Sequence, residues 1–225
     1  MTKTSNPITI AVLGGTGHEG GGLALRWARA GHRVIIGSRD GGRAATHAAD
    51  LTATAGTTIE GMGNREAAAA AQIVVLAVPF SAQMATALGV GDELIGKILI
   101  DVTVPLVPPK VGRVQLPGGG SAVVLLQEKL GEAVKVVAAF QNISAHQLAD
   151  LDREIDCDVL VSGDDEAARQ IVVGLAEDGG MLAWHAGPLA NSAAAEALTS
   201  VLISINRRYK IATGSGIRIT GARSA

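Results

Sequence analysis

A glycine-rich stretch near the N-terminus constrains the fold of this chain more than any other feature. Residues 14–22 read GGTGHEGGG, directly after the apolar run ITIAVL and before LALRWARA, whose apolar residues recur with a helical period. Six of these nine residues are glycine. Glycine tolerates backbone conformations that other residues avoid, but it destabilises a helix. So many glycines at a helix start therefore indicate a backbone that lies very close to something else.

The spacing of these glycines is that of a dinucleotide-binding loop. Gly15, Gly17 and Gly20 match G-x-G-x-x-G between a predicted strand at 8–13 and a predicted helix at 18–30. The first glycine permits a tight turn, the second lets a pyrophosphate approach the backbone, and the third lets the helix pack on the strand. The phosphates then meet free N–H groups at the positive end of the helix dipole. We expect the cofactor loop to consist of Gly15, Thr16, Gly17, His18, Glu19 and Gly20.

The remainder of the first 145 residues predicts an α/β fold. Runs rich in Val and Ile predict strands at 8–13, 33–38, 57–61, 72–78, 97–104 and 134–140. Ala-rich segments between them predict helices near 18–30, 42–55, 64–71, 81–88 and 121–130. Gly31 and Gly131 are placed to end two of these helices, and Asn64 and Ser121 to cap the start of two others. Several strands are apolar throughout, as expected when helices cover both faces, so we predict a Rossmann-type doubly wound parallel sheet.

The alternation changes after about residue 145. Strands are expected at 157–163 and 181–187, on either side of a helix near 165–177, and a long helix starts near Asn191. The long helix carries an apolar stripe, predicted to pack on the main domain or on another subunit: Ala194, Leu198, Val201, Leu202, Ile205 and Tyr209. We therefore divide the chain into a dinucleotide-binding domain, 1–145, and a small C-terminal α/β-helical domain, 146–225, that closes the substrate cleft. We expect a homodimer. The proline-rich segment 104–120 is predicted to be a long loop.

The end of the second strand indicates which dinucleotide is bound. NAD sites usually place an acidic residue there, whereas this chain reads GSRDGGR, with Ser38, Arg39 and Arg43. A hydroxyl and two guanidinium groups suit a 2′-phosphate, and Thr16 could add another hydroxyl. The carboxylate of Asp40 would oppose the phosphate, but it is expected to point away because it lies past the strand end. The cofactor is therefore predicted to be NADP.

Three further strand ends are expected to complete the site, because ligands bind outside the carboxyl ends of parallel strands. The first two segments are expected to flank the nicotinamide: Ala77, Val78, Pro79 and Phe80, then Val104 and Pro105. The second substrate is expected to contact the third strand end, which consists of Gln141, Asn142 and Ile143.

The sequence offers few groups for acid–base chemistry. Its only tyrosine is Tyr209, and position 213 is Thr, so the Tyr–Lys pair of short-chain dehydrogenases is absent. His146 and His185 have no acidic partner close in sequence, and no Cys/His cluster suggests zinc. We therefore predict no catalytic acid or base and no metal. Two binding surfaces with few such groups suit hydride transfer between two redox cofactors, where positioning supplies most of the catalysis.

Composition and charge limit which binding partners and which cellular compartment are expected. The 19 basic and 21 acidic residues nearly balance, which does not favour nucleic acid as a partner. No run is long and apolar enough to suggest a membrane span, and no signal-peptide pattern is found. Cys157 is the single cysteine, which fits a reducing cytoplasm. We expect small-molecule redox cofactors as partners and a cytoplasmic location.

The chain resembles the coenzyme F420-dependent NADP reductases. The likeness rests on VLGGTGHEGGGLALRWARAGHRVIIGSR, VVLAVPF, CDVLVSGDDEAAR, AGPLANSAAAEALTSVLISIN and GSGIRIT, in this order over nearly the whole chain. The resemblance implies a Rossmann domain with a small C-terminal domain, and direct hydride transfer between NADP and the deazaflavin F420 in the cleft between them. It also implies that Thr16, Ser38, Arg39 and Arg43 bind the 2′-phosphate.

One segment departs from the family pattern and leaves the second substrate open. Gln141–Asn142–Ile143 falls where archaeal members have His-Thr-Ile. The acceptor could then be F420, a flavin, another small molecule or a metal chelate, and the oxidoreductase domain of membrane metalloreductases is also similar. A regulator that senses NADP without turning it over is the alternative outside enzymes.

Overall fold

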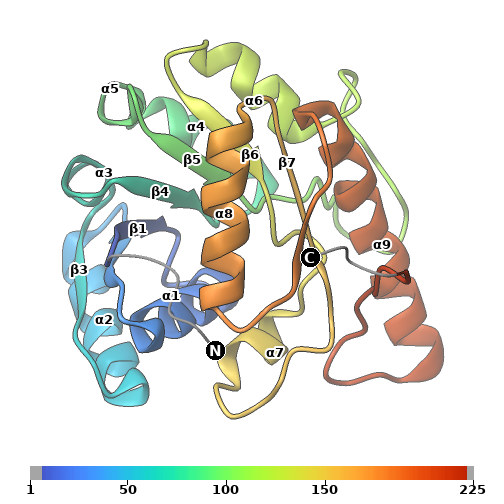
Figure 1. Cartoon of the computed structure of the whole chain (residues 1–225), viewed down its shortest axis with the longest axis horizontal. Coiled ribbons are helices and arrows are strands. Elements are labelled where there is room, and N and C mark those ends of the chain that lie inside the picture. The colour runs from blue at the N-terminus through green and yellow to red at the C-terminus, as the bar shows by residue number, and fades with distance from the viewer. Residues whose placement is uncertain (1–6, 222–225) are drawn as a thin grey trace.

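A computed structural model describes residues 7–221, which form one layered α/β unit (Figure 1). The strands are β1 (Thr9–Leu13), β2 (Arg33–Ser38), β3 (Ile59–Gly63), β4 (Ile73–Leu76), β5 (Ile98–Asp101), β6 (Lys135–Ala138), β7 (Val159–Gly163) and β8 (Ala183–His185). The helices are α1 (His18–Ala30), α2 (Gly41–Ala55), α3 (Asn64–Ala70), α4 (Phe80–Leu88), α5 (Gly91–Leu94), α6 (Ala122–Leu130), α7 (Ala145–Ala149), α8 (Glu166–Asp178) and α9 (Ser192–Tyr209), with a 3₁₀ turn at Leu189–Asn191.

The strands form one sheet in the order β3-β2-β1-β4-β5-β6-β7-β8. Neighbouring strands pair in parallel except β6 and β7, where Val137 lies opposite Gly163 in an antiparallel pair. The order reverses between β1 and β4, so the carboxyl ends of these strands border the crevice where such sheets bind ligands. The predicted doubly wound α/β sheet is confirmed.

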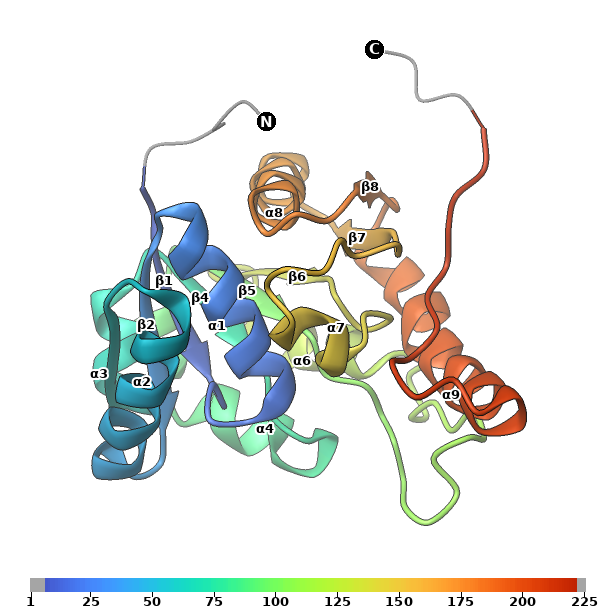
Figure 2. The same ribbon diagram turned by 90° about the horizontal axis from the view of Figure 1, so that it is seen from below.

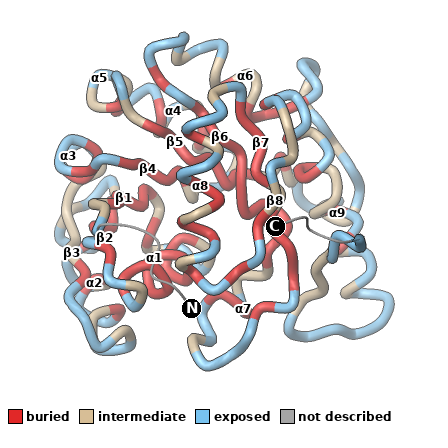
Figure 3. The backbone as a smooth tube through the Cα atoms, in the orientation of Figure 1, coloured by how far each residue is buried: buried red, intermediate tan, exposed pale blue. Residues whose placement is uncertain are grey.

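Two hydrophobic layers cover the sheet, because successive side chains of a strand point to opposite faces. Ile10 and Val12 of β1 pack into a cluster that includes residues of α1, α2, α7 and α8. Ala11 and Leu13 join a second cluster on the other face with residues of α3, α4, α5 and α6. Figure 2 shows the sheet from below, and Figure 3 shows that buried residues concentrate on the strands. Helices on both faces explain why these strands are apolar throughout.

Local capping explains several helix boundaries. Gly31 ends α1 with a φ of 100°, which glycine adopts without steric cost. Ser121 caps α6 by accepting hydrogen bonds from the backbone N–H groups of Val123 and Val124. The expected cap at Asn64 is wrong, because Gly63 occupies the cap position and Asn64 is already helical. The Glu66 carboxylate instead accepts a hydrogen bond from the backbone N–H of Gly63 at 3.1 Å.

Other expectations differ from the structure in detail. The third strand runs over Ile59–Gly63 rather than 57–61, and the short helices α5 and α7 were not predicted. The stripe of the last helix is buried only in part, because Leu202 is buried whereas Val201, Ile205 and Tyr209 are exposed. Within residues 7–221, no helix is long and apolar enough to cross a membrane, and no cluster of His, Cys, Asp and Glu could hold a metal.

The C-terminal part of the chain extends the sheet with β7 and β8 and then continues into α9. In Figure 1, α9 lies at the opposite side of the molecule from α2. Arg26 of α1 donates hydrogen bonds to carbonyl oxygens of α7, its flanking residues and the end of α8. The division of the chain into two domains at residue 145 remains a prediction.

Candidate functional site

Several glycines of the loop between β1 and α1 lie where a side chain has no room. A Cβ atom added to Gly14 or Gly15 would collide with Ala77 or Ile36, and one on Gly20 would lie 2.9 Å from the carbonyl oxygen of Gly14. At Gly17 the added atom would approach only the Gly14 oxygen, at 3.3 Å. Gly15 and Gly20 therefore keep the loop and the helix close to the strands, while the open side of the loop lies at Gly17. The first backbone N–H groups of α1 have no partner inside the helix and can bind an anion there.

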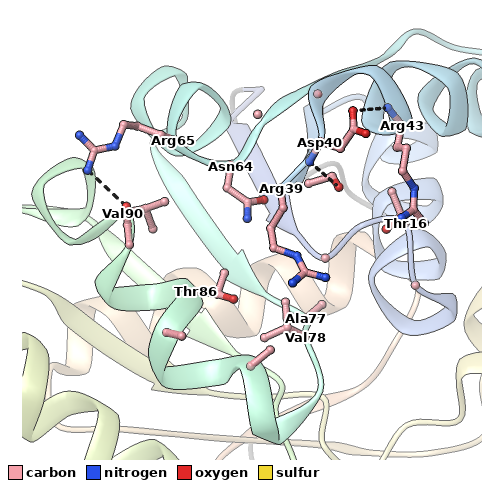
Figure 4. Close-up of a pocket in the computed structure, with 18 of the residues that line it drawn as sticks. Thr16, Arg39, Asp40, Arg43, Asn64, Arg65, Ala77, Val78, Thr86 and Val90 are labelled. Atoms are coloured by element: carbon pink, nitrogen blue, oxygen red, sulfur yellow. Dashed lines mark hydrogen bonds between the residues drawn. The ribbon is translucent and has the colours of Figure 1, made fainter.

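A pocket of about 1180 Å³ begins at this loop (Figure 4). The pocket is lined by the ends of β2 and β3 and by the loops and helices that follow β1, β2, β3 and β4. Eight of the predicted site residues line it: Thr16, Gly17, Ser38, Arg39, Arg43, Ala77, Val78 and Pro79. This volume is a little above the range of about 300–1,000 Å³ typical of small-molecule sites, so the pocket is large enough for a cofactor.

The residues that come after β2 form the basic side of the pocket. In Figure 4, Arg39 extends across the middle of the pocket toward Ala77 and Val78, and Arg43 lies beside Thr16. Both arginines are exposed, and neither guanidinium group makes an ion pair with another residue of the described chain. An anionic ligand would therefore not have to displace a carboxylate from them.

Asp40 lines the same pocket but its carboxylate is already used. It accepts hydrogen bonds from the backbone N–H groups of Gly42, at 2.9 Å, and Arg43, at 3.2 Å. The carboxylate thereby caps α2 and lies at the positive end of that helix. This contact explains how an acidic residue can border a basic site.

The far end of the pocket contains residues that the sequence reasoning missed, among them Asn64, Arg65 and Thr86. Asn64 follows directly after β3, and its buried Oδ1 atom has no hydrogen-bond partner in the described part of the chain. Arg65 donates to the Gly89 carbonyl at 3.3 Å, and its Nε lies 3.4 Å from the Glu93 carboxylate. The sequence predicts that this strand ends at residue 61, two residues too early. With its actual end at Gly63, Asn64 lies at the carboxyl edge of the sheet, where ligand residues are expected.

The other predicted residues lie outside the lining of this pocket. His18 is exposed, and Glu19, Phe80 and Val104 are half-buried. Gly15, Gly20, Pro105, Gln141, Asn142 and Ile143 are buried. The half-buried apolar members of this group are Phe80, which begins α4, and Val104, which follows β5 at the edge of the sheet. Half-buried apolar side chains at this edge suit the face of a flat ring.

The buried carboxylate of Asp101, at the end of β5, connects these segments. It accepts hydrogen bonds from the backbone N–H of Thr103, at 2.8 Å, and from the Gln83 side chain of α4. The backbone oxygen of Asp101 accepts from Gln141 Nε2 at 2.8 Å. One residue therefore fixes α4, the loop after β5 and the loop after β6 relative to one another.

The amide of Asn142 points into the protein. Its Nδ2 donates to the Asp158 carbonyl at 2.8 Å and approaches Cys157 Sγ at 3.4 Å. The Gln141 amide is likewise held by Asp101, so both amide nitrogens are engaged inside the protein. The side-chain oxygens of Gln141 and Asn142 are buried and have no hydrogen-bond partner within residues 7–221.

Three carboxyl groups near the strand ends have perturbed acidity. Burial, and then the nearby Asp101, raises the pKa of Glu19 to about 8. Burial raises the pKa of Asp101 to about 6, against the hydrogen bonds from Thr103 and Gln83, which lower it. Burial also raises the pKa of Glu196 on α9, which accepts from Ser121 Oγ at 2.6 Å and from the Ala122 N–H at 2.9 Å. Groups of this kind are common at functional sites.

The fold and the pocket together define a Rossmann-type dinucleotide-binding protein. Residues 9–105 match the family model described as NADP oxidoreductase, coenzyme F420-dependent. The chain is 41% identical over 220 residues to the F420-dependent NADP reductase of Methanocaldococcus jannaschii, covering 94% of this chain and 97% of that protein. The chain belongs to the F420-dependent NADP reductase family, whose members are oxidoreductases.

One solved structure agrees with this membership, and a metalloreductase is similar over part of its length. A solved structure from Arthrobacter sp. FB24, described as a candidate F420-dependent NADP reductase, superposes with a TM-score of 0.81 at 27% identity. The superposition covers 95% of this chain and 100% of the other. The metalloreductase STEAP3 of Rattus norvegicus is 30% identical over 189 residues, which cover 84% of this chain but only 36% of that protein.

Proposed function

We propose that this protein transfers a hydride between NADP(H) and the deazaflavin coenzyme F420. The observation that carries the proposal is the pocket that joins a crowded glycine loop to two arginines without ion pairs. Membership of a family of F420-dependent NADP reductases supplies the reaction. When bound, the nicotinamide and the deazaflavin would supply the redox chemistry, and the protein would bind and orient the two rings.

Different residues around the pocket bind different parts of NADP. The N–H groups at the start of α1 bind the pyrophosphate, and Gly17 allows its close approach. Arg39 and Arg43, with the hydroxyl groups of Thr16 and Ser38, bind the 2′-phosphate. These side chains make the site prefer NADP to NAD.

The nicotinamide end continues along the carboxyl ends of β4 and β5. Ala77, Val78 and Pro79 line the pocket, and Phe80 and Val104–Pro105 lie at the neighbouring edge. Their apolar surfaces orient the rings and exclude water from the transferred hydride. The loop Gln141–Ile143, held by Asp101 and Asp158, borders the second ring.

Absorbance spectroscopy tests the reaction directly. Purified protein given NADPH and oxidised F420 is expected to bleach the deazaflavin band, at a far lower rate when NADH replaces NADPH. Oxidation of NADPH by FMN or FAD without any reaction of F420 would reject F420 and keep a reductase. Binding of NADP without turnover of F420, flavins or ferric chelates would reject the enzyme and favour an NADP sensor.

We infer that the active form is a homodimer. Val201, Ile205 and Tyr209 leave an apolar strip of α9 exposed, and Tyr209 is 72% exposed. Ser204 Oγ donates to the Gly112 carbonyl at 2.6 Å, so the loop after β5 continues this surface. Sedimentation should give twice the mass of the chain, and Val201→Glu should halve it. A wild-type monomer would contradict this inference.

We also infer a cytoplasmic location. Its support is the single buried cysteine, Cys157, which needs no oxidising compartment. Fractionation of the source cells, followed by detection with an antibody, should recover the protein with the cytoplasmic markers. Recovery with the membrane or extracellular fraction would contradict the inference.

A further inference from the structure

Glu19 is the only acidic residue of the glycine loop, and phosphate binding gives it no role. It lies in the first turn of α1, where its half-buried side chain makes no hydrogen bond and no ion pair within residues 7–221. A carboxylate beside a bound pyrophosphate would repel it. A neutral carboxyl group would not.

The helical repeat shows which way Glu19 faces. Gly22 and Arg26 follow it at three and seven positions, so the three residues share one side of α1. A Cβ on Gly22 would touch Leu148 of α7, and Arg26 donates to the Leu148 carbonyl at 3.0 Å. Glu19 therefore lies on the α7 side of the helix, at the end nearest the carboxyl edge of the sheet.

Asp101 is the electrostatic neighbour of Glu19, but its surroundings are different. Asp101 is fully buried and accepts hydrogen bonds from Thr103 and Gln83, which stabilise its charged form. Glu19 has no donor of this kind, and its pKa rises to about 8, whereas that of Asp101 rises to about 6. At neutral pH the pair therefore holds one charge, on Asp101, and one proton, on Glu19.

The other charged groups nearby do not change this assignment. Arg26 is committed to main-chain carbonyls, and His18 in the same turn is exposed. The α9 carboxylate of Glu196 acts on Asp101 and raises its pKa. The protonated group thus lies in the cofactor loop with Asp101 as its electrostatic neighbour, and the backbone oxygen of Asp101 in turn accepts the hydrogen bond of Gln141 in the loop after β6.

We propose that the Glu19 carboxyl group donates the proton that accompanies hydride transfer to the second substrate. The proposal rests on the proposed function. For each hydride, which brings an electron pair to a ring carbon, Glu19 breaks its O–H bond as an N–H bond forms on the same ring. Glu19 becomes a carboxylate and takes its next proton from water. In the reverse direction the Glu19 carboxylate accepts the ring proton as the hydride leaves.

A titration without cofactors tests the proton on Glu19. Carbon-13 NMR of protein labelled at the glutamate carboxyl carbons should show one signal that titrates near pH 8, and Glu19→Gln should remove it. Glu166→Gln is the matched control, because Glu166 is an exposed glutamate in the first turn of α8. Absence of a glutamate titrating above pH 7, or its survival in Glu19→Gln, would overturn the proposal.

The pH profile tests the use of this proton. Reduction of F420 by NADPH should decline above about pH 8 in the wild type, while the reverse reaction should rise over the same range. Glu19→Gln should flatten both profiles and lower the rate at neutral pH by about tenfold to a hundredfold, with KM for NADPH unchanged. A declining limb retained in Glu19→Gln would overturn proton donation alone. No turnover by the wild type with any acceptor would overturn both this inference and the proposed function.

Discussion

Arg26 on α1 donates a hydrogen bond from its Nε atom to the carbonyl oxygen of Leu148, at 3.0 Å and 122 residues further along the chain. The same guanidinium group reaches four more carbonyl oxygens, those of Gln147, Asp150, Arg153 and Gly179. Arg26 therefore holds the end of α7 and the end of α8 close to α1. The planar guanidinium group of arginine carries five N–H donors, two more than the ammonium group of lysine, so it can bind more acceptors at once.

Replacing Arg26 should destabilise the fold. Arg26→Met keeps most of the apolar stem but leaves several buried carbonyls unpaired, so we expect a loss of at least about 3 kcal/mol in the free energy of unfolding. Arg26→Lys should recover only part of this loss. Urea denaturation measures both, with Arg29→Met as the control, because Arg29 is exposed and only approaches Asp152 at 3.5 Å. Equal stability of the Met variant and the wild type would contradict the prediction.

Arg39→Ala should weaken NADPH specifically. Loss of one charge-assisted contact to the 2′-phosphate corresponds to about 1.5–3 kcal/mol, while NADH has no such phosphate to lose. KM for NADPH should therefore rise steeply, and KM for NADH should hardly change. Arg113→Ala, which removes an exposed arginine from the loop after β5, serves as the control. An equal rise for both cofactors would show that Arg39 does not read the 2′-phosphate.

The pH dependence of stability should reveal the buried Asp101. Its pKa is raised from 3.8 to about 6 in the folded protein, so folding favours the protonated form. The stability that this group contributes is complete below pH 4 and is lost as the pH rises through 6. Relative to Asp101→Asn, the wild type should lose up to about 1.4 kcal/mol per pH unit between these limits. Urea denaturation of both proteins from pH 4 to 7 checks this, and a constant difference would refute it.

Gly216→Ala should release the C-terminal segment. A Cβ at this position would collide with Cys157 Sγ, which also receives a hydrogen bond from the Ile217 N–H at 3.4 Å. The buried thiol should then react faster with a thiol reagent such as DTNB. Gly118→Ala is the control, because a Cβ there meets nothing within 4 Å. Unchanged protection of Cys157 in Gly216→Ala would mean that the segment adapts to the extra atom.

The glycine loop and the basic strand end could be predicted from sequence because their chemistry depends on short spacings. Gly15, Gly17 and Gly20 lie within six residues, and Ser38 ends a clear strand that Arg39 and Arg43 follow. The structure brings Thr16 and Arg43 together at one pocket, as the strand-end rule implies. The α/β class followed from the same local periodicity.

Contacts between distant segments could not be predicted in this way. The hydrogen bonds from Gln83 and Gln141 to Asp101 join α4, the end of β5 and the loop after β6, which are adjacent only because β4, β5 and β6 are neighbours in the sheet. Asn64 was missed because the register of β3 is set by its pairing with β2, where Ser38 lies opposite Gly63. The raised pKa of Glu19 depends on burial, which no local pattern records.

The Glu196 carboxylate on α9 satisfies the N–H of Ala122 and the hydroxyl of Ser121 at the start of α6. These groups are 74 and 75 residues apart in the chain. During synthesis, α6 therefore leaves the ribosome well before the residue that completes its N-terminus. Its first turn has to remain hydrated, or be capped by Ser121 alone, until α9 has been made. A chain that stops before α9 would keep the whole cofactor loop and yet leave a helix end open beside the sheet.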